Sequence, residues 1–325
     1  MIDGFGRRIT YVRLSITDRC DLRCRYCMSE QMTFMPNSDL LTVDEIMRLA
    51  GHLTKRGVRR IRLTGGEPLV RRDFGAIVEG LGARLGSGLD ELTLTTNGTL
   101  LRRHAATIAK AGVQRVNVSL DTLDPERFRH ITRRGLLAQV LDGIEAAAAA
   151  GLKIKINMVA LGGLNDDQIE PMMQWCAQHG HDLTLIETMP LGEVEERRDA
   201  HYLPLDAVQR TLDAKYGLAP SAERTGGPAR YYQVGGLGLK LGLITPLTNN
   251  FCASCNRVRI TATGTSYGCL GQSQKVDFRD ALRAGDDAAV ERLIDHLAFA
   301  KPQRHDFDIA RSAPAVERHM SVTGG

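Results

Sequence analysis

The sequence lacks any long apolar run. None of its hydrophobic stretches approaches the roughly 20 residues that cross a bilayer as a helix, and residues 1–8 are polar and glycine-rich, without the apolar core of a signal peptide. A strong excess of charge of one sign is missing as well, because the 42 basic side chains are nearly balanced by 38 acidic ones. We therefore expect a cytoplasmic protein that binds neither membranes nor nucleic acid, although a net charge of +4 suits an anionic ligand.

A disulfide framework is also missing. The chain has seven cysteines, and an odd number in a cytoplasmic protein favours metal ligation over disulfide bonds. Cys176 stands alone within a helical pattern, and we expect it to be a small buried apolar residue. The other six form an early and a late group of three: Cys20, Cys24 and Cys27, then Cys252, Cys255 and Cys269.

Strand-like and helix-like segments alternate from residue 10 to about residue 190. Short connections between such units predict a parallel sheet with right-handed crossovers. Six units are too few for a closed eight-stranded barrel, so we expect an open α/β structure, a partial (β/α)6 barrel. The predicted strands are 11–17, 60–64, 91–96, 115–120, 152–160 and 182–188, and the predicted helices between them are 42–56, 71–85, 100–111, 136–150 and 165–179.

The alternating rhythm breaks after residue 190. A polar stretch at 193–199 precedes a predicted helix at 204–216, and a helical region at 277–300 follows the late cysteines. The chain ends on Gly324-Gly325. We therefore divide it into a barrel region, residues 1–190, and a C-terminal region, residues 191–325, which we expect to pack against the barrel.

Polar and apolar side chains alternate along the predicted strands. Crossover helices must cover one face of a parallel sheet, and that face takes the apolar set. The polar set then points inward, which indicates a lumen that holds a large polar ligand, although a two-layer sheet with one wet face is an alternative. The sixth strand does not fit either pattern clearly. The inward set is Arg13, Ser15, Thr17, Arg60, Arg62, Thr64, Thr93, Thr95, Asn97, Asn117, Ser119, Asp121, Lys153, Lys155 and Asn157.

The early cysteines follow the first predicted strand, at the rim where barrel enzymes place their sites. Three thiolates in a C-x3-C-x2-C loop suit an iron–sulfur cluster with one iron left open. A zinc site would need a fourth ligand, and the nearest downstream histidine, His52, lies in a predicted helix. At the end of the second strand, Gly65 and Gly66 permit close backbone approach to a ligand, and Glu67 could receive an ammonium group.

The late cysteines are spaced C-x2-C-x13-C and again number three. A zinc site completed by His296 or His305 is the alternative to a second cluster. Arg257 and Arg259 lie between these cysteines, and strand alternation places them on one side. They are either an ordinary solvated pair or a pair presented to whatever lies beside the cluster.

The early loop together with Gly65-Gly66-Glu67-Pro68 resembles the radical S-adenosylmethionine (SAM) superfamily. The late motif C-x2-C-N-R-V-R-x13-C and the Gly-Gly end make the resemblance more specific. With them, the chain resembles the GTP 3′,8-cyclase family of molybdenum cofactor biosynthesis from residue 7 to residue 325. Asp21 replaces an expected asparagine, and residues 265–268 and Gly271 also depart from the family pattern. None of these departures removes a ligand.

This resemblance implies a radical SAM partial barrel whose C-terminal region carries a second iron–sulfur cluster. Cys20, Cys24 and Cys27 would hold one [4Fe–4S] cluster, whose open iron SAM chelates. Cys252, Cys255 and Cys269 would hold the other, whose open iron binds guanine. A 5′-deoxyadenosyl radical would abstract the C3′ hydrogen of GTP and yield (8S)-3′,8-cyclo-7,8-dihydro-GTP. The implied SAM contacts are Tyr26, Gly66, Ser119 and Met189, and the implied GTP contacts are Arg13, Arg62, Thr95, Lys155, Arg257, Val258 and Arg259.

Partners follow from the same resemblance. We expect an electron donor such as flavodoxin or ferredoxin, a downstream cyclic pyranopterin monophosphate synthase, and a homodimer. A radical SAM peptide-modifying enzyme with an auxiliary cluster is the main alternative, although such enzymes usually carry more downstream cysteines. A zinc protein that binds nucleic acid is the alternative from another class, and it requires a concentrated basic face.

Overall fold

The computed structural model describes residues 1–192, 194, 198–311 and 313–324. The predicted polar stretch at 193–199 therefore lies partly outside the described residues, and Gly325 lies outside them. Six parallel strands form the centre, in chain order and in the predicted places: β1 (Tyr11–Ser15), β2 (Arg60–Thr64), β3 (Glu91–Thr96), β4 (Arg115–Ser119), β5 (Lys153–Ala160) and β6 (Asp182–Glu187).

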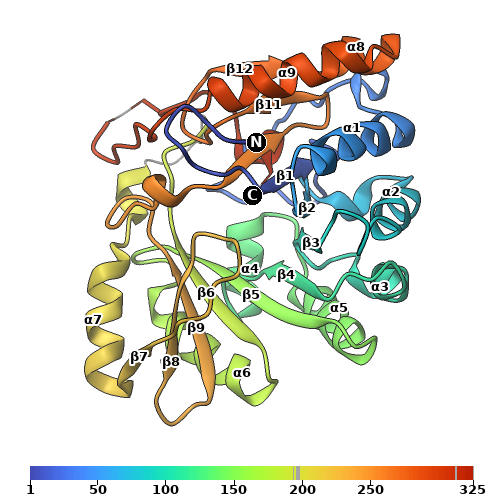
Figure 1. Ribbon diagram of the computed structural model, residues 1–325. Coiled ribbons are helices and arrows are strands. Elements are labelled where there is room, and N and C mark those ends of the chain that lie inside the picture. The colour runs from blue at the N-terminus through green and yellow to red at the C-terminus, as the bar shows by residue number, and fades with distance from the viewer. Residues whose placement is uncertain (193, 195–197, 312, 325) are drawn as a thin grey trace.

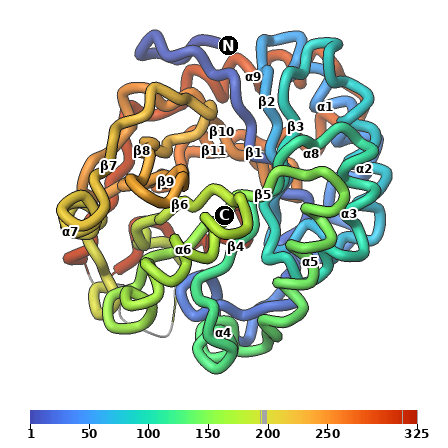
Figure 2. Tube along the Cα trace, turned by 90° about the horizontal axis from the view of Figure 1, so that it is seen from below, coloured from blue at the N-terminus to red at the C-terminus, as the bar shows by residue number. Residues whose placement is uncertain are grey.

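Helices cover the outer face of these strands, as Figure 2 shows for α1, α2, α3 and α5. The first helix starts at a capping box, in which the hydroxyl of Thr42 accepts from the backbone of Glu45 and the carboxylate of Glu45 accepts from that of Thr42. One helix in the barrel, α4, had not been predicted. The barrel helices are α1 (Val43–Lys55), α2 (Phe74–Gly82), α3 (Leu101–Lys110), α4 (Pro125–Thr132), α5 (Leu137–Ala149) and α6 (Ile169–Gln178).

The C-terminal region extends the same sheet at both edges (Figure 1). On one edge β10 (Arg257–Ile260) runs parallel to β1 and continues into β11 (Thr265–Tyr267) and β12 (Lys275–Asp277). On the other edge β9 (Leu239–Ile244) runs parallel to β6 and continues into β8 (Arg230–Val234) and β7 (Leu218–Pro220). One sheet of 12 strands therefore joins the two regions of the sequence.

The remaining helices belong to the C-terminal region. The predicted helix at 204–216 is α7 (Leu205–Tyr216). The predicted helical region at 277–300 is two helices, α8 (Arg279–Ala284) and α9 (Asp287–Phe299), because Gly285 takes a left-handed conformation with φ of +73°. A short helix, α10 (Met320–Thr323), contacts β1. In the described part of the chain no helix has the length and apolar character of a membrane span.

The predicted alternation is confirmed. Val12 and Leu14 pack in the apolar core under the helices, whereas Arg13 faces a cavity on the inner side of the sheet. The sixth strand, which the sequence left open, turns Thr184 and Ile186 toward the inner side and buries Leu183 and Leu185 in the core. Cys176 is buried in the same core, as expected.

Candidate active site

The early cysteines line a cavity at the carboxyl ends of the central strands, which we call the first cavity. Cys20, Cys24 and Cys27 all border it, and the turn between the last two closes with a 2.9 Å bond from the amide of Cys27 to the carbonyl of Cys24. Every predicted SAM contact also borders this cavity, and so does Thr95, which had been assigned to GTP. The residues concerned are Tyr26, Gly66, Thr95, Ser119 and Met189.

Burial disfavours ionisation of the first three thiols. Burial raises the pKa of Cys24, and burial together with Asp121 raises that of Cys27 to about 11, although the amide of Ser321 opposes the rise. In the described residues no group of three or more His, Cys, Asp or Glu side chains is placed to hold a metal ion. The zinc alternative is therefore not supported.

Gly65 and Gly66 lie so close to the backbone of residues 17–19 that no side chain fits at either position. A Cβ on Gly66 would lie 2.3 Å from the carbonyl oxygen of Arg19, and one on Gly65 would lie 2.6 Å from that of Thr17. These contacts hold the end of β2 against the segment that leads into the early cysteines. The two glycines thus allow the end of β2 and the segment before Cys20 to pack together at the first cavity.

Glu67 does not face the first cavity, contrary to the idea that it receives an ammonium group. Its carboxylate is fully buried and accepts bonds from the amide of Leu69 at 3.0 Å, the hydroxyl of Thr96 at 2.8 Å and the amide of Asn97 at 2.6 Å. Burial raises the pKa of Glu67 to about 8. Its carboxylate joins the ends of β2 and β3.

Tyr26 and Asp21 anchor the early loop on neighbouring strands. The hydroxyl of Tyr26 donates to Asp121 at 2.7 Å, and burial raises the pKa of Asp121 to about 6. Asp21, the departure from the family pattern, accepts from the side chains of Asn97 at 2.7 Å and Thr99 at 2.6 Å. The aspartate therefore ties the loop to the end of β3. Its carboxylate also accepts from the thiol of Cys20 at 3.9 Å, and its charge adds to burial and to Glu67 in raising the pKa of Cys20.

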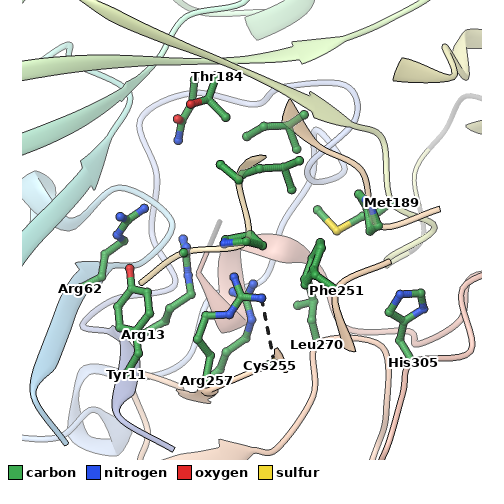
Figure 3. Close-up of a pocket in the computed structure, with 18 of the residues that line it drawn as sticks. Tyr11, Arg13, Arg62, Thr184, Met189, Phe251, Cys255, Arg257, Leu270 and His305 are labelled. Atoms are coloured by element: carbon green, nitrogen blue, oxygen red, sulfur yellow. Dashed lines mark hydrogen bonds between the residues drawn. The ribbon is translucent and has the colours of Figure 1, made fainter. Parts of the chain in front are cut away.

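The late cysteines line a second cavity, whose walls gather five basic side chains (Figure 3). In the figure Arg13, Arg62 and Arg257 rise from neighbouring strands beside Tyr11. Burial, and next the adjacent guanidinium of Arg257, lower the pKa of Arg259 to about 9. Such shifts show that positive charge here is poorly balanced, so an anionic ligand would stabilise it. The five are Arg13, Arg62, Lys155, Arg257 and Arg259.

Three basic residues that the sequence did not single out as site residues hold the backbone around the late cysteines. The guanidinium of Arg7 donates to the carbonyl of Cys252 at 2.8 Å. The ammonium of Lys301 donates to the carbonyl of Gly268 at 2.7 Å and lies 3.4 Å from the sulfur of Cys255. The guanidinium of Arg318 donates to the carbonyl of Cys269 at 3.3 Å. Each cysteine segment is thus fixed by a cation from a distant part of the chain.

Cys255 differs from the early cysteines in its ionisation. Its burial opposes the thiolate, but Arg257 and Lys301 outweigh burial and lower its pKa to about 7. His305, one histidine of the alternative zinc site, borders the second cavity and stacks on Phe307 with ring centroids 4.3 Å apart. In the described residues it joins no group that could bind a metal ion. A zinc site completed by His305 is therefore not supported.

The two cavities adjoin each other on the inner side of the sheet. Asn157, Ile186, Met189 and Met320 border both of them. The two cysteine groups therefore border adjoining cavities, an arrangement that suits a reaction between two bound molecules.

The end of the chain lies at the border of these cavities. The amide of Ser321 bonds to the sulfur of Cys27, and the guanidinium of Arg259 donates to the carbonyls of Thr323, at 3.3 Å, and Gly324. Gly324 takes φ of +79°, and any side chain there would overlap Thr64. The tail thus connects the surroundings of the first cysteines with those of the second.

Val258 is placed differently from the other predicted GTP contacts. Its side chain is 1% exposed and packs in the apolar core, because it alternates with Arg257 and Arg259 on β10. Its side chain therefore does not border either cavity. The individual SAM and GTP contacts remain predictions.

Comparison with known proteins agrees with this arrangement. Residues 14–176 match the model of the radical SAM superfamily, and residues 181–307 match that of the Molybdenum Cofactor Synthesis C family. Proteins named GTP 3′,8-cyclase from Rhizobium meliloti (strain 1021) and Erythrobacter litoralis (strain HTCC2594) are 58% and 57% identical to it; each match covers 100% of this chain, and 94% and 98% of those proteins. The chain belongs to the GTP 3′,8-cyclase family. This family is one of radical SAM enzymes that use two [4Fe–4S] clusters and SAM.

Solved structures show the fold alone. The crystal structure of Streptococcus suis SuiB bound to S-adenosylmethionine superposes with a TM-score of 0.62 at 15% identity, and the match covers 88% of this chain and 68% of that one. SuiB bound to its precursor peptide SuiA gives a TM-score of 0.62 at 14% identity, covering 89% and 67%. At this identity the likeness supports the radical SAM barrel and says nothing of substrate.

Proposed function

We propose that this member of the GTP 3′,8-cyclase family converts GTP to (8S)-3′,8-cyclo-7,8-dihydro-GTP, the first step of molybdenum cofactor biosynthesis. The observation that carries the proposal is the convergence of five basic side chains on the second cavity, which adjoins the cavity of the early cysteines. A nucleoside triphosphate carries several negative charges, and fixed guanidinium groups bind phosphate oxygens with directed hydrogen bonds.

Two [4Fe–4S] clusters and SAM would occupy these two adjoining cavities. Cys20, Cys24 and Cys27 would hold the first cluster, and Tyr26, Gly66, Ser119 and Met189 would contact SAM. Cys252, Cys255 and Cys269 would hold the second cluster. When bound, the first cluster and SAM supply a 5′-deoxyadenosyl radical, and the second cluster supplies an open iron for guanine. The protein's own part is to orient GTP between them and to exclude water.

GTP would be bound chiefly by the basic residues of the lumen. Arg13 and Arg62 extend from neighbouring strands in register with each other, and Lys155 extends from β5. The backbone of Val258 and the hydroxyl of Thr95 would complete the site, the latter from the first cavity. Because the guanidinium groups are buried and crowd one another, the triphosphate would replace mutual repulsion with attraction.

The partners of the reaction belong to the same proposal. A small electron-transfer protein such as flavodoxin or ferredoxin would reduce the first cluster, and a cyclic pyranopterin monophosphate synthase would consume the product. We also propose that the enzyme works in the cytoplasm as a homodimer, which sedimentation analysis of the reconstituted protein would test.

Substitution of Arg257 and Arg259 by alanine tests the substrate assignment. Each loses hydrogen bonds to a charged group, about 1.5–3 kcal/mol, so kcat/KM for GTP should fall by about 10- to 100-fold in each single variant. Iron content should stay at that of the parent protein. The control is Arg210→Ala, whose arginine lies 72% exposed on α7.

The assay is anaerobic incubation with dithionite, SAM and GTP, followed by nucleotide analysis. If both variants lose iron, the arginines have a structural role instead. If the parent protein forms 5′-deoxyadenosine at the same rate without GTP and no cyclised nucleotide appears, GTP is not the substrate.

A further inference from the structure

The excess positive charge of the chain is concentrated in two short segments. Residues 19–30 and 125–134 together contain seven arginines and three carboxylates. Their excess of four positive charges equals the net charge of +4 of the whole chain. The rest of the sequence is therefore electrically balanced, whereas these two segments are basic.

The two segments lie side by side in the structure. The backbone amides of Arg23 and Arg25 donate to the carbonyls of Thr132 and Ile131, both at 3.0 Å. The guanidinium of Arg25 donates at 2.9 Å to the carbonyl of His130, which is 105 residues away in sequence. Figure 2 shows α4 at the lower edge of the barrel beside the blue, early part of the chain. The end of α4 is thus packed on the loop that carries the early cysteines.

A strained residue fixes this packing. Arg133 has φ of +62°, and among the described residues it is the only one besides glycine with positive φ. That conformation is unfavourable for a residue with a side chain. Its guanidinium donates to the carbonyls of Arg23, at 3.1 Å, and Met28, at 3.5 Å. The turn after α4 is therefore held at a defined place against the cysteine loop.

The surface made by these segments is available to a partner. Arg129 and Arg134 are exposed, and neither forms an ion pair with any residue that the structure describes, whereas Arg127 pairs with Asp167. Leu136, just beyond the same turn, is 56% exposed. Unpaired arginines beside an exposed apolar side chain are typical of a protein interface, and their charge selects an acidic partner.

We propose that this surface, residues 19–30 with residues 125–136, docks an acidic protein that carries one electron. The inference rests on the proposed function in requiring that the first cluster be reduced. In the docked complex one electron leaves the carrier's redox group, which is oxidised by one electron, and enters the first cluster. Electron transfer weakens steeply with distance, and this surface is packed directly on the loop of Cys20, Cys24 and Cys27. Charge attraction would speed the encounter and orient the carrier.

Charge reversal on this surface provides the test. The variant Arg129→Glu with Arg134→Glu is compared with a control, Arg210→Glu with Arg292→Glu, which changes net charge equally. The control arginines are 72% and 71% exposed and lie on α7 and α9, at the left and top of Figure 2 and away from α4. Each reconstituted holoenzyme is reduced either by an acidic flavodoxin or by dithionite. Cluster absorbance and 5′-deoxyadenosine are followed with time.

The expected result is specific to the protein reductant. Reduction by flavodoxin slows about tenfold or more at low salt in the variant of Arg129 and Arg134. The difference disappears near 1 M salt, where the screening length falls to about 3 Å. The control variant matches the parent, and dithionite reduces all three proteins equally.

Two results would overturn the docking site. One is a flavodoxin rate in the Arg129 and Arg134 variant equal to that of the parent. The other is an equal loss in the control variant, which would indicate a general effect of net charge. Failure of the proposed function looks different: 5′-deoxyadenosine forms with dithionite in every protein, but no cyclised GTP is found.

Discussion

The affinity for GTP should fall as pH rises above neutrality, because Lys155 can bind phosphate only when protonated. Lys155 is 5% exposed, and its ammonium bonds to the hydroxyl of Tyr231. Burial, followed by the nearby charges of Arg115 and Arg62, lowers the pKa of Lys155 to about 7. A bound triphosphate favours the ammonium form and raises this pKa, so binding takes up a proton. Affinity is therefore highest below pH 7 and decreases above it.

The size of the effect follows from the pKa. If the bound form titrates above the range measured, the dissociation constant of GTP is inversely proportional to the protonated fraction of free Lys155. For a pKa of about 7, that fraction falls about 25-fold between pH 6.5 and pH 8.5, which is about 1.9 kcal/mol. Ionisation of the terminal phosphate of GTP also changes in this range, and a control variant must remove its contribution.

The assay is equilibrium binding of GTP to the reconstituted, unreduced protein across this pH range. The control is Lys155→Arg, because a guanidinium keeps its proton to a higher pH than an ammonium in the same place. We expect the parent protein to lose affinity about 25-fold relative to the control over two pH units. Parallel pH profiles for the two proteins would refute the role of Lys155 as a titrating phosphate contact.

Two further predictions concern the framework around the cysteines. Lys301→Met removes the ammonium bonded to the carbonyl of Gly268 and should lower iron from about eight to about four per chain. SAM cleavage with dithionite should remain, Lys215→Met should keep all its iron, and full retention in the Lys301 variant would contradict the account. Gly66→Ala would place a Cβ 2.3 Å from a backbone carbonyl, so it should lower the melting temperature and abolish SAM binding. The control is Gly75→Ala, where a Cβ meets nothing closer than 3.9 Å; it should leave the protein unchanged or more stable by about 0.5–1 kcal/mol. A Gly66 variant that melts at the normal temperature and binds SAM would contradict this prediction, because the packing would then be able to relax.

The central strands could be predicted within two residues at each end. Their alternation of polar and apolar side chains is local information, and crossover helices on one face leave one interpretation of it. The same alternation predicted that Arg257 and Arg259 lie on one side of their strand. It correctly placed Arg13, Arg62 and Lys155 in the lumen before any relative was considered.

The edge strands could not be predicted, because their partners are distant in sequence. Tyr11 on β1 lies opposite Arg257 on β10, and nothing in the local pattern of either segment encodes that pairing. The missed helix α4 follows the end of β4, where no helix had been predicted. The sequence therefore indicated a barrel and an appended region, whereas the appended region supplies strands to both edges of the sheet.

Several site residues were missed for a different reason. Lysine and arginine are usually exposed, so no spacing marks Arg7, Lys301 or Arg318 as residues that turn inward to hold carbonyl groups. Glu67 illustrates the opposite error, because a motif carboxylate expected to face a ligand instead joins two strand ends.

Transfer of the C3′ hydrogen of GTP tests the central claim most directly. The reconstituted protein is incubated anaerobically with dithionite, SAM and GTP that carries deuterium at C3′. Mass spectrometry then measures deuterium in the 5′-deoxyadenosine and identifies the nucleotide product. We predict one deuterium in 5′-deoxyadenosine and formation of the 3′,8-cyclised nucleotide. Unlabelled 5′-deoxyadenosine with unchanged GTP would contradict the account.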